Sequence, residues 1–150
     1  MAFLDDLNAA LKEALKSRDD IRVSVIRMIK ASLKNREIEK MGSLTDDEIL
    51  SVLSTLAKQR RESIEQFAAA GRTDLAEKET KELEIVQSYL PKQLSQQELD
   101  SIIRAAISES GASSLNDLGK VMKVLMPRVK GIADGKAVNQ RVKELLVPVP

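Results

Sequence analysis

Apolar side chains recur every three or four residues through most of this 150-residue chain, and this spacing restricts the fold to helices. In the first segment, residues 3–17, the repeat runs through Leu4, Leu7, Leu11 and Ala14. No stretch shows the apolar–polar alternation that is typical of a β-strand. The sequence therefore predicts an all-α protein.

Short polar segments divide the first 90 residues into four expected helices. Asp19 can begin the second helix, and Gly42 with the serine after it can end that helix as a C-cap. Thr45 and Glu48 have the spacing of a capping box at the start of a long third helix. That helix should end at the turn 71–73, whose threonine should cap the fourth helix.

Pro91 marks the expected boundary between two domains, because a proline disfavours helical backbone in the residue before it. We expect an N-terminal helical domain over residues 1–90 and a small C-terminal helical domain over residues 92–150, which should fold without the first. Charge divides at the same place. Residues 1–90 hold 15 Lys and Arg against 17 Asp and Glu, whereas residues 91–150 hold 9 against 6.

Caps and breakers also divide the second half. Ser95 and Glu98 form a second candidate capping box, and the helix that follows should end at Gly111. A serine at 113 or 114 should open the next helix, and Pro127 should stop it. A last helix then runs towards the C-terminus.

The composition excludes several classes of site. Without Cys or His, the chain has no disulfides, no ordinary zinc site and no histidine base. We see no pairing of a nucleophile with a base, and we predict no catalytic residue, metal site or cofactor. No apolar run approaches the ~18 residues of a membrane span, and the first residues are acidic where a secretory signal would be basic. We predict a cytoplasmic protein that does not associate with membranes.

The segment 131–137, GIADGKA, resembles a phosphate-binding loop only superficially. Three residues, not four, separate Gly131 from Gly135, and Ala137 stands where Ser or Thr would bind magnesium. We interpret the tail glycines as turns between short helices, with an aspartate capping the last helix. The predicted turn residues are Gly119, Gly131, Asp134 and Gly135.

Basic residues gather in the same tail. A lysine at the start of a helix, as at Lys136, lies beside free backbone amides that suit a phosphate. A solvated helical face is the alternative explanation, because basic helical faces are common. The candidate RNA-binding residues are Lys120, Lys123, Arg128, Lys130, Lys136 and Arg141.

A second basic face lies on the expected second helix. Arg27, Lys30 and Lys34 are spaced by three and four residues, and therefore share one side of the helix. Ion pairs with acids of neighbouring helices are their expected role.

The motifs of the tail resemble a known family. The stretches YLPKQLSQQELDSII and LGKVMKVLMPRVKGIADGKAVNQRVKELL, together with the opening DLNAALKEALKSRDDIRVSVIRMIKASLKNREIEK, resemble the YqeY (GatB/YqeY) family over nearly the whole chain. The C-terminal part is also similar to the tail domain of the GatB subunit of the aspartyl/glutamyl-tRNA amidotransferase. The resemblance implies two helical domains, of which the second handles tRNA. It also implies a link to carbon–nitrogen ligases with glutamine as amido donor, although this chain lacks their catalytic cradle.

Three functions follow as hypotheses. The first is a non-catalytic tRNA-associated accessory protein that binds folded tRNA through the basic C-terminal helices. The near-absence of aromatic residues favours recognition of a folded RNA over base stacking on a single strand. The alternatives are an adaptor that docks an aminoacyl-tRNA synthetase or the amidotransferase, and amide transfer as part of a complex.

Overall fold

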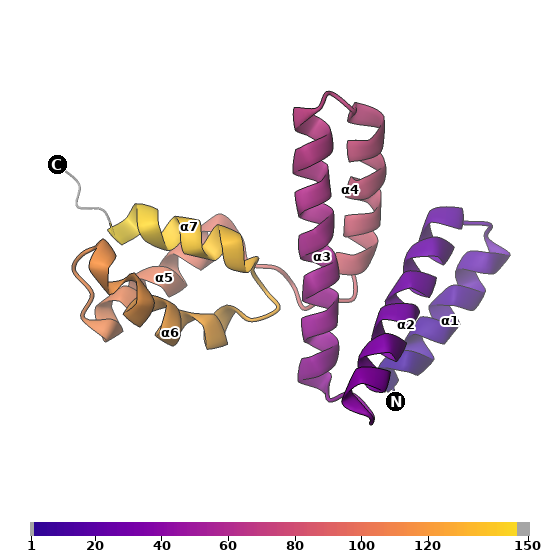
Figure 1. The fold of residues 1–150 in the computed structure, drawn as a ribbon, viewed down its shortest axis with the longest axis horizontal. Coiled ribbons are helices and arrows are strands. Elements are labelled where there is room, and N and C mark those ends of the chain that lie inside the picture. The colour runs from indigo at the N-terminus through magenta and orange to yellow at the C-terminus, as the bar shows by residue number, and fades with distance from the viewer. Residues whose placement is uncertain (1, 147–150) are drawn as a thin grey trace. The chain divides into compact units, whose positions relative to one another are not determined.

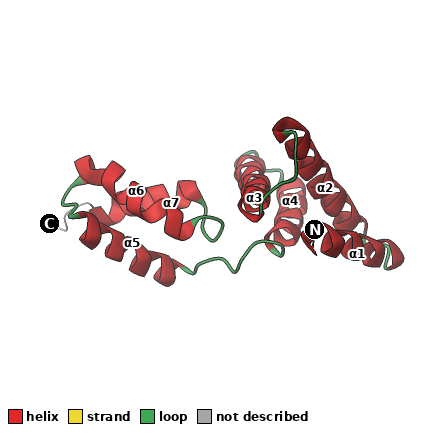
Figure 2. Ribbon diagram, turned by 90° about the horizontal axis from the view of Figure 1, so that it is seen from below, coloured by secondary structure: helices red, strands yellow, loops and turns green. Residues whose placement is uncertain are grey.

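The structure, a computed structural model, describes residues 2–146. Every regular element in that range is helical, as the sequence predicted, and Figures 1 and 2 show helices joined by loops. The elements are α1 Ala2–Lys16, α2 Asp20–Lys40, α3 Asp46–Ala69, α4 Thr73–Gln87, α5 Gln96–Ser110, the short 3₁₀ helix η1 Leu115–Asp117, α6 Leu118–Val129 and α7 Gly135–Leu146.

The chain divides between Leu90 and Pro91 into an N-terminal and a C-terminal unit. Each unit has a hydrophobic core of its own. Independent folding of the C-terminal unit stays a prediction, and positions 147–150 of the expected domain lie outside the described residues.

In the N-terminal unit, α1 pairs with α2 and α3 pairs with α4 (Figure 1). Helix α2 also contacts α3 and α4, so it joins the two pairs. The side chains that point inward repeat at helical spacing and are aliphatic. The most deeply buried are Leu7, Ala14, Val25, Ile26, Ile29, Leu53, Ala57 and Val86.

The C-terminal unit packs α5, α6 and α7 around a smaller aliphatic core. The unit spans about 60 residues, which is near the lower limit for an independent core, so each buried side chain contributes a large share of its stability. Those with no exposed surface are Ile103, Ala106, Val121, Leu125, Val129, Val138 and Val142.

Local capping signals are confirmed in three places. The Thr45–Glu48 box is complete: the Glu48 amide donates to Thr45 Oγ1 at 3.2 Å, and the Thr45 amide donates to Glu48 Oε2 at 3.1 Å. The Arg22 amide donates to the Asp19 carboxylate at 3.1 Å, which caps α2. Gly111 ends α5 in the left-handed conformation that glycine favours, with φ +71°.

The predicted end of α2 was one residue too late. Met41, not Gly42, adopts the left-handed C-cap conformation, with φ +62°. The Gly42 amide then donates to Glu37 O at 3.2 Å. Lys40 fixes this turn, because its ammonium donates to Ser43 O at 2.9 Å and to Glu48 Oε2 at 2.8 Å. These contacts hold the C-terminal end of α2 against the start of α3. Local sequence does not reveal this packing.

Three further cap assignments were wrong or incomplete. Thr73 is the first residue of α4 rather than its cap, since Gly71 turns the chain earlier. Ser114 precedes η1 without a capping bond from its side chain, and Ser113 instead donates its amide to Asp117 Oδ2 at 3.0 Å. The Glu98 amide donates to Ser95 Oγ at 3.2 Å, but the Glu98 carboxylate does not return the bond.

Pro127 does not stop α6, which continues through it to Val129. Pro127 is exposed, so water can satisfy the carbonyl that loses its amide partner one turn earlier. Val129 has no exposed surface, and its burial in the core favours two more residues of helix.

Candidate nucleic-acid interface

Helix α6 presents two of the predicted lysines to solvent. Val121 and Leu125 face the core with no exposed surface, so Lys120 and Lys123 lie on the opposite side of the helix. Lys130 follows the helix as its C-cap residue and is also exposed. Positions 120, 123 and 130 are three and seven residues apart and therefore belong to one side of α6.

The three lysines are poorly neutralised by their own chain. The Lys120 ammonium lies 3.7 Å from Asp117 Oδ1, and its side chain is 72% exposed. Asp117 is already engaged, since its carboxylate accepts from the Ser113 amide, a bond that lowers its pKa. Within residues 2–146, Lys123 and Lys130 have no carboxylate partner.

The other three candidate residues interact within the chain. Arg128 of α6 pairs with Glu109 of α5 on the surface. Lys136 lies exposed in the first turn of α7 and already has an interaction within the chain. An RNA-binding role for these two, as for Arg141, stays a prediction.

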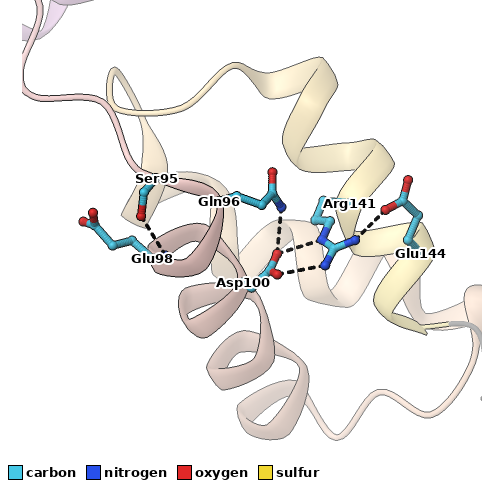
Figure 3. Close-up of polar contacts among 6 residues, drawn as sticks. All are labelled: Ser95, Gln96, Glu98, Asp100, Arg141 and Glu144. Atoms are coloured by element: carbon cyan, nitrogen blue, oxygen red, sulfur yellow. Dashed lines mark hydrogen bonds and ion pairs between the residues drawn. The ribbon is translucent and has the colours of Figure 1, made fainter.

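Arg141 of α7 forms a bidentate ion pair with Asp100 of α5 (Figure 3). Its Nε donates to Asp100 Oδ1 at 2.7 Å, and one terminal nitrogen donates to Asp100 Oδ2 at 2.8 Å. The other terminal nitrogen donates to Glu144 Oε2 at 2.7 Å, and Gln96 Nε2 donates to Asp100 Oδ1 at 2.9 Å. The guanidinium thus joins α5 to α7 and has few donors left for a ligand.

Sequence reasoning missed this ion pair. Asp100 and Arg141 lie 41 positions apart, and no local spacing relates them. The hydrogen bonds from Arg141, and then from Gln96, lower the pKa of Asp100 to about 2. The same pair raises the pKa of Arg141.

The stability of the C-terminal unit should therefore fall in acid. The pKa of Asp100 is lowered from 3.8 to about 2, so its contribution to the free energy of unfolding is complete above pH 3.8 and is lost as the pH falls towards 2. We expect Asp100→Asn to lower the melting temperature at neutral pH, and the difference from the wild type to shrink as the pH falls through about 2. Thermal unfolding followed by circular dichroism across this range measures it. Glu109→Gln, which breaks only the surface pair with Arg128, is the control, and equal acid profiles for Asp100→Asn and the wild type would contradict the assignment.

The glycines of the tail have different roles. Gly131 forms a turn after α6 with φ +80°, and Gln93 Nε2 donates to its carbonyl at 2.9 Å. Asp134 precedes α7 and Gly135 begins it. The prediction for Gly119 was wrong, because this residue lies inside the first turn of α6 and not between helices. A glycine between two predicted helices is typical of a turn, but α6 already begins at Leu118.

No helix of the described residues is long and apolar enough to cross a membrane. Over the same range, no three acidic side chains lie close enough together to hold a metal ion.

The relatives of this chain include fungal proteins named "Altered inheritance of mitochondria protein 41, mitochondrial". The protein of Pyrenophora tritici-repentis is 32% identical over 149 residues, which cover 95% of this chain and 80% of the relative. That of Lachancea thermotolerans is 36% identical over 107 residues, which cover 69% of this chain and 57% of the relative. That of Eremothecium gossypii is 39% identical over 88 residues, which cover 58% of this chain and 48% of the relative. The matched part therefore spans only about half of the length of some of these relatives.

The family comparison covers nearly all of the described residues. The sequence profile of the family described as "Yqey-like protein" matches residues 4–146, which include both helical units and the lysines of α6. The chain belongs to this Yqey-like protein family.

Proposed function

We propose that this chain is a non-catalytic accessory protein that binds folded tRNA through Lys120, Lys123 and Lys130 of its C-terminal unit. The observation that carries the proposal is the exposure of these three lysines on one side of α6 with almost no neutralisation by carboxylates of the described chain. Unneutralised lysines in a row suit a phosphate backbone, because each contact releases a condensed counterion.

A folded RNA fits this surface better than a single strand. The chain contains only two Phe and one Tyr, and no Trp, so it cannot offer a series of stacking platforms. Phe3 and Tyr89 pack edge to face in the N-terminal unit with ring centroids 6.0 Å apart, which occupies two of these three rings. The choice of tRNA as the RNA rests on the resemblance of the C-terminal motifs to the tail domain of the GatB subunit. The proposal applies in any compartment that contains tRNA, whether the cytoplasm predicted from the sequence or the mitochondrion in the relatives' names.

Titration of fluorescent, refolded total tRNA with the full chain tests the proposal. Fluorescence anisotropy at several salt concentrations should give binding that weakens with salt, with a slope near −0.9 for each phosphate contact. A polyuridine single strand of equal charge should bind more weakly. Absence of tRNA binding at low salt would refute the proposal.

Gly119 provides a test in which folding and binding should change in opposite directions. Its backbone is not left-handed, and an added Cβ would meet no atom within 4 Å, so nothing within the chain requires glycine there. Gly119→Ala should stabilise α6 by up to about 1 kcal/mol, because alanine is the better helix former. It should also weaken tRNA binding several-fold, since the methyl group would hold a phosphate backbone away from Lys120 and Lys123.

Thermal unfolding and anisotropy on the same protein samples measure both effects of Gly119→Ala. Gly42→Ala is the control, because Gly42 is also exposed with open space around its Cβ position but lies in the N-terminal unit. Unchanged tRNA affinity in Gly119→Ala would mean that RNA does not approach this part of α6.

A further inference from the structure

A mainly apolar groove of about 380 Å³ opens on the N-terminal unit. It is lined by one side of α2, the beginning of α1 and the beginning of α3 with the residues just before it. Its apolar lining consists chiefly of Phe3, Leu4, Leu33, Leu44 and Ile49. Leu4 remains 40% exposed, so the groove is accessible from solvent.

Lys30 and Lys34 of α2 also line the groove. We expected such bases to pair with acids of neighbouring helices, but neither lysine has a carboxylate partner within residues 2–146. Lys30 is nevertheless half-buried. The acidic residue of the lining is Glu37, so the groove keeps an excess of positive charge. A partly desolvated ammonium gains most from a carboxylate that arrives with a ligand.

Two exposed apolar side chains lie at the C-terminal end of α2, after the last residue of this helix that lines the groove. Ile38 is 64% exposed and Met41 is 92% exposed, and both follow Glu37 within one turn. Positions 30, 34 and 37 have the three- and four-residue spacing of one helical side, and Met41 follows the helix as its left-handed C-cap. Side chains left in water this way contribute almost nothing to folding, so the exposed Ile38 and Met41, which follow the lining residue Glu37 in sequence, are available to a partner.

We propose that this groove binds an acidic amphipathic helix of a partner protein. The apolar side chains of the partner helix enter between α1, α2 and α3, and the carboxylates of the partner helix pair with Lys30 and Lys34. A helix in a groove uses apolar anchors along one face, which matches an apolar lining that also carries two lysines. The sugar-phosphate backbone of RNA has no apolar side chains that could enter such a groove. This surface belongs to the N-terminal unit and is separate from the lysines of α6, so the inference goes beyond tRNA binding.

Selection from a displayed library of random helical peptides on the full chain provides the first test. The peptides that are enriched should carry Leu, Ile, Met or Phe at helical spacing, flanked by Asp or Glu. Enrichment of basic or purely polar peptides would overturn the proposal, as would the absence of any binder.

A synthetic copy of the most enriched peptide provides the second test, by anisotropy against variants of the full chain. Lys30→Glu with Lys34→Glu should weaken binding by about tenfold or more, because two attractions become repulsions. Leu4→Asp, at a partly exposed position of the lining, should weaken it as well. Lys12→Glu with Lys58→Glu makes the same change of charge at exposed positions outside the groove and should bind like the wild type.

Further measurements identify the kind of ligand. Circular dichroism should show that all variants keep their helix content, and tRNA affinity should not differ between the Lys30/Lys34 and Lys12/Lys58 double variants. The proposal fails if peptide affinity does not depend on Lys30 and Lys34. It also fails if laurate or anionic phosphatidylglycerol vesicles bind through these lysines and exclude the peptide, because the groove would then be a lipid site.

Discussion

Reversing the charge of Lys120, Lys123 and Lys130 together should reduce the affinity for folded tRNA by about a hundredfold or more at about 0.1 M salt. These lysines are exposed, and among the described residues only Lys120 has a nearby carboxylate, at 3.7 Å, so the change removes charge that the described part of the chain hardly neutralises. Each lost phosphate contact should also reduce the salt slope by about one. Anisotropy titrations over a salt series give both quantities.

Two controls separate this effect from net charge and from folding. Lys12→Glu, Lys58→Glu and Lys78→Glu together make the same change of charge on exposed residues of the N-terminal unit, and should weaken binding far less. Arg141→Gln should destabilise the C-terminal unit, because Arg141 holds Asp100 and Glu144, and should change the salt slope little while the unit stays folded. If the α6 variant and the N-terminal control bind equally, tRNA does not use the α6 surface.

Leu125→Ala should unfold the C-terminal unit and leave the N-terminal unit folded. Leu125 has no exposed surface and lies in the core between α5, α6 and α7. Removing a fully buried leucine side chain costs about 2–5 kcal/mol, which is comparable with the whole stability expected of a unit of this size. Calorimetry of the full chain should show loss of one transition while a second remains, and a fragment starting at Pro91 should unfold cooperatively when it carries the wild-type leucine.

Leu115→Ala provides the matched control, since the same substitution at a residue that is 49% exposed should change the melting profile little. The reciprocal variant Leu53→Ala, at a buried position of the N-terminal core, should affect the other transition. A single transition that moves as a whole in both core variants would show that the two units unfold as one.

Much of the fold follows from sequence because helix signals are local. The Thr45–Glu48 box and the glycine cap at Gly111 involve residues within a few positions of one another, so their spacing alone identifies them. Periodic burial is local in the same sense, and Leu7 and Ala14 of the first predicted repeat are buried. Met41 and Pro127 escaped prediction because packing decides them: Lys40 ties the end of α2 to α3, and burial of Val129 extends α6 past a proline.

By itself, the sequence determined an all-α chain with a boundary at Pro91 and a basic tail, since periodicity, caps and composition depend on neighbours along the chain. Which basic side chains remain available was decided only by tertiary structure. Arg141 pairs with Asp100 across 41 positions, whereas Lys123 and Lys130 have no carboxylate within reach among the described residues. Coulomb attraction and hydrogen bonding depend on distance in space, which sequence spacing does not give once the chain has turned.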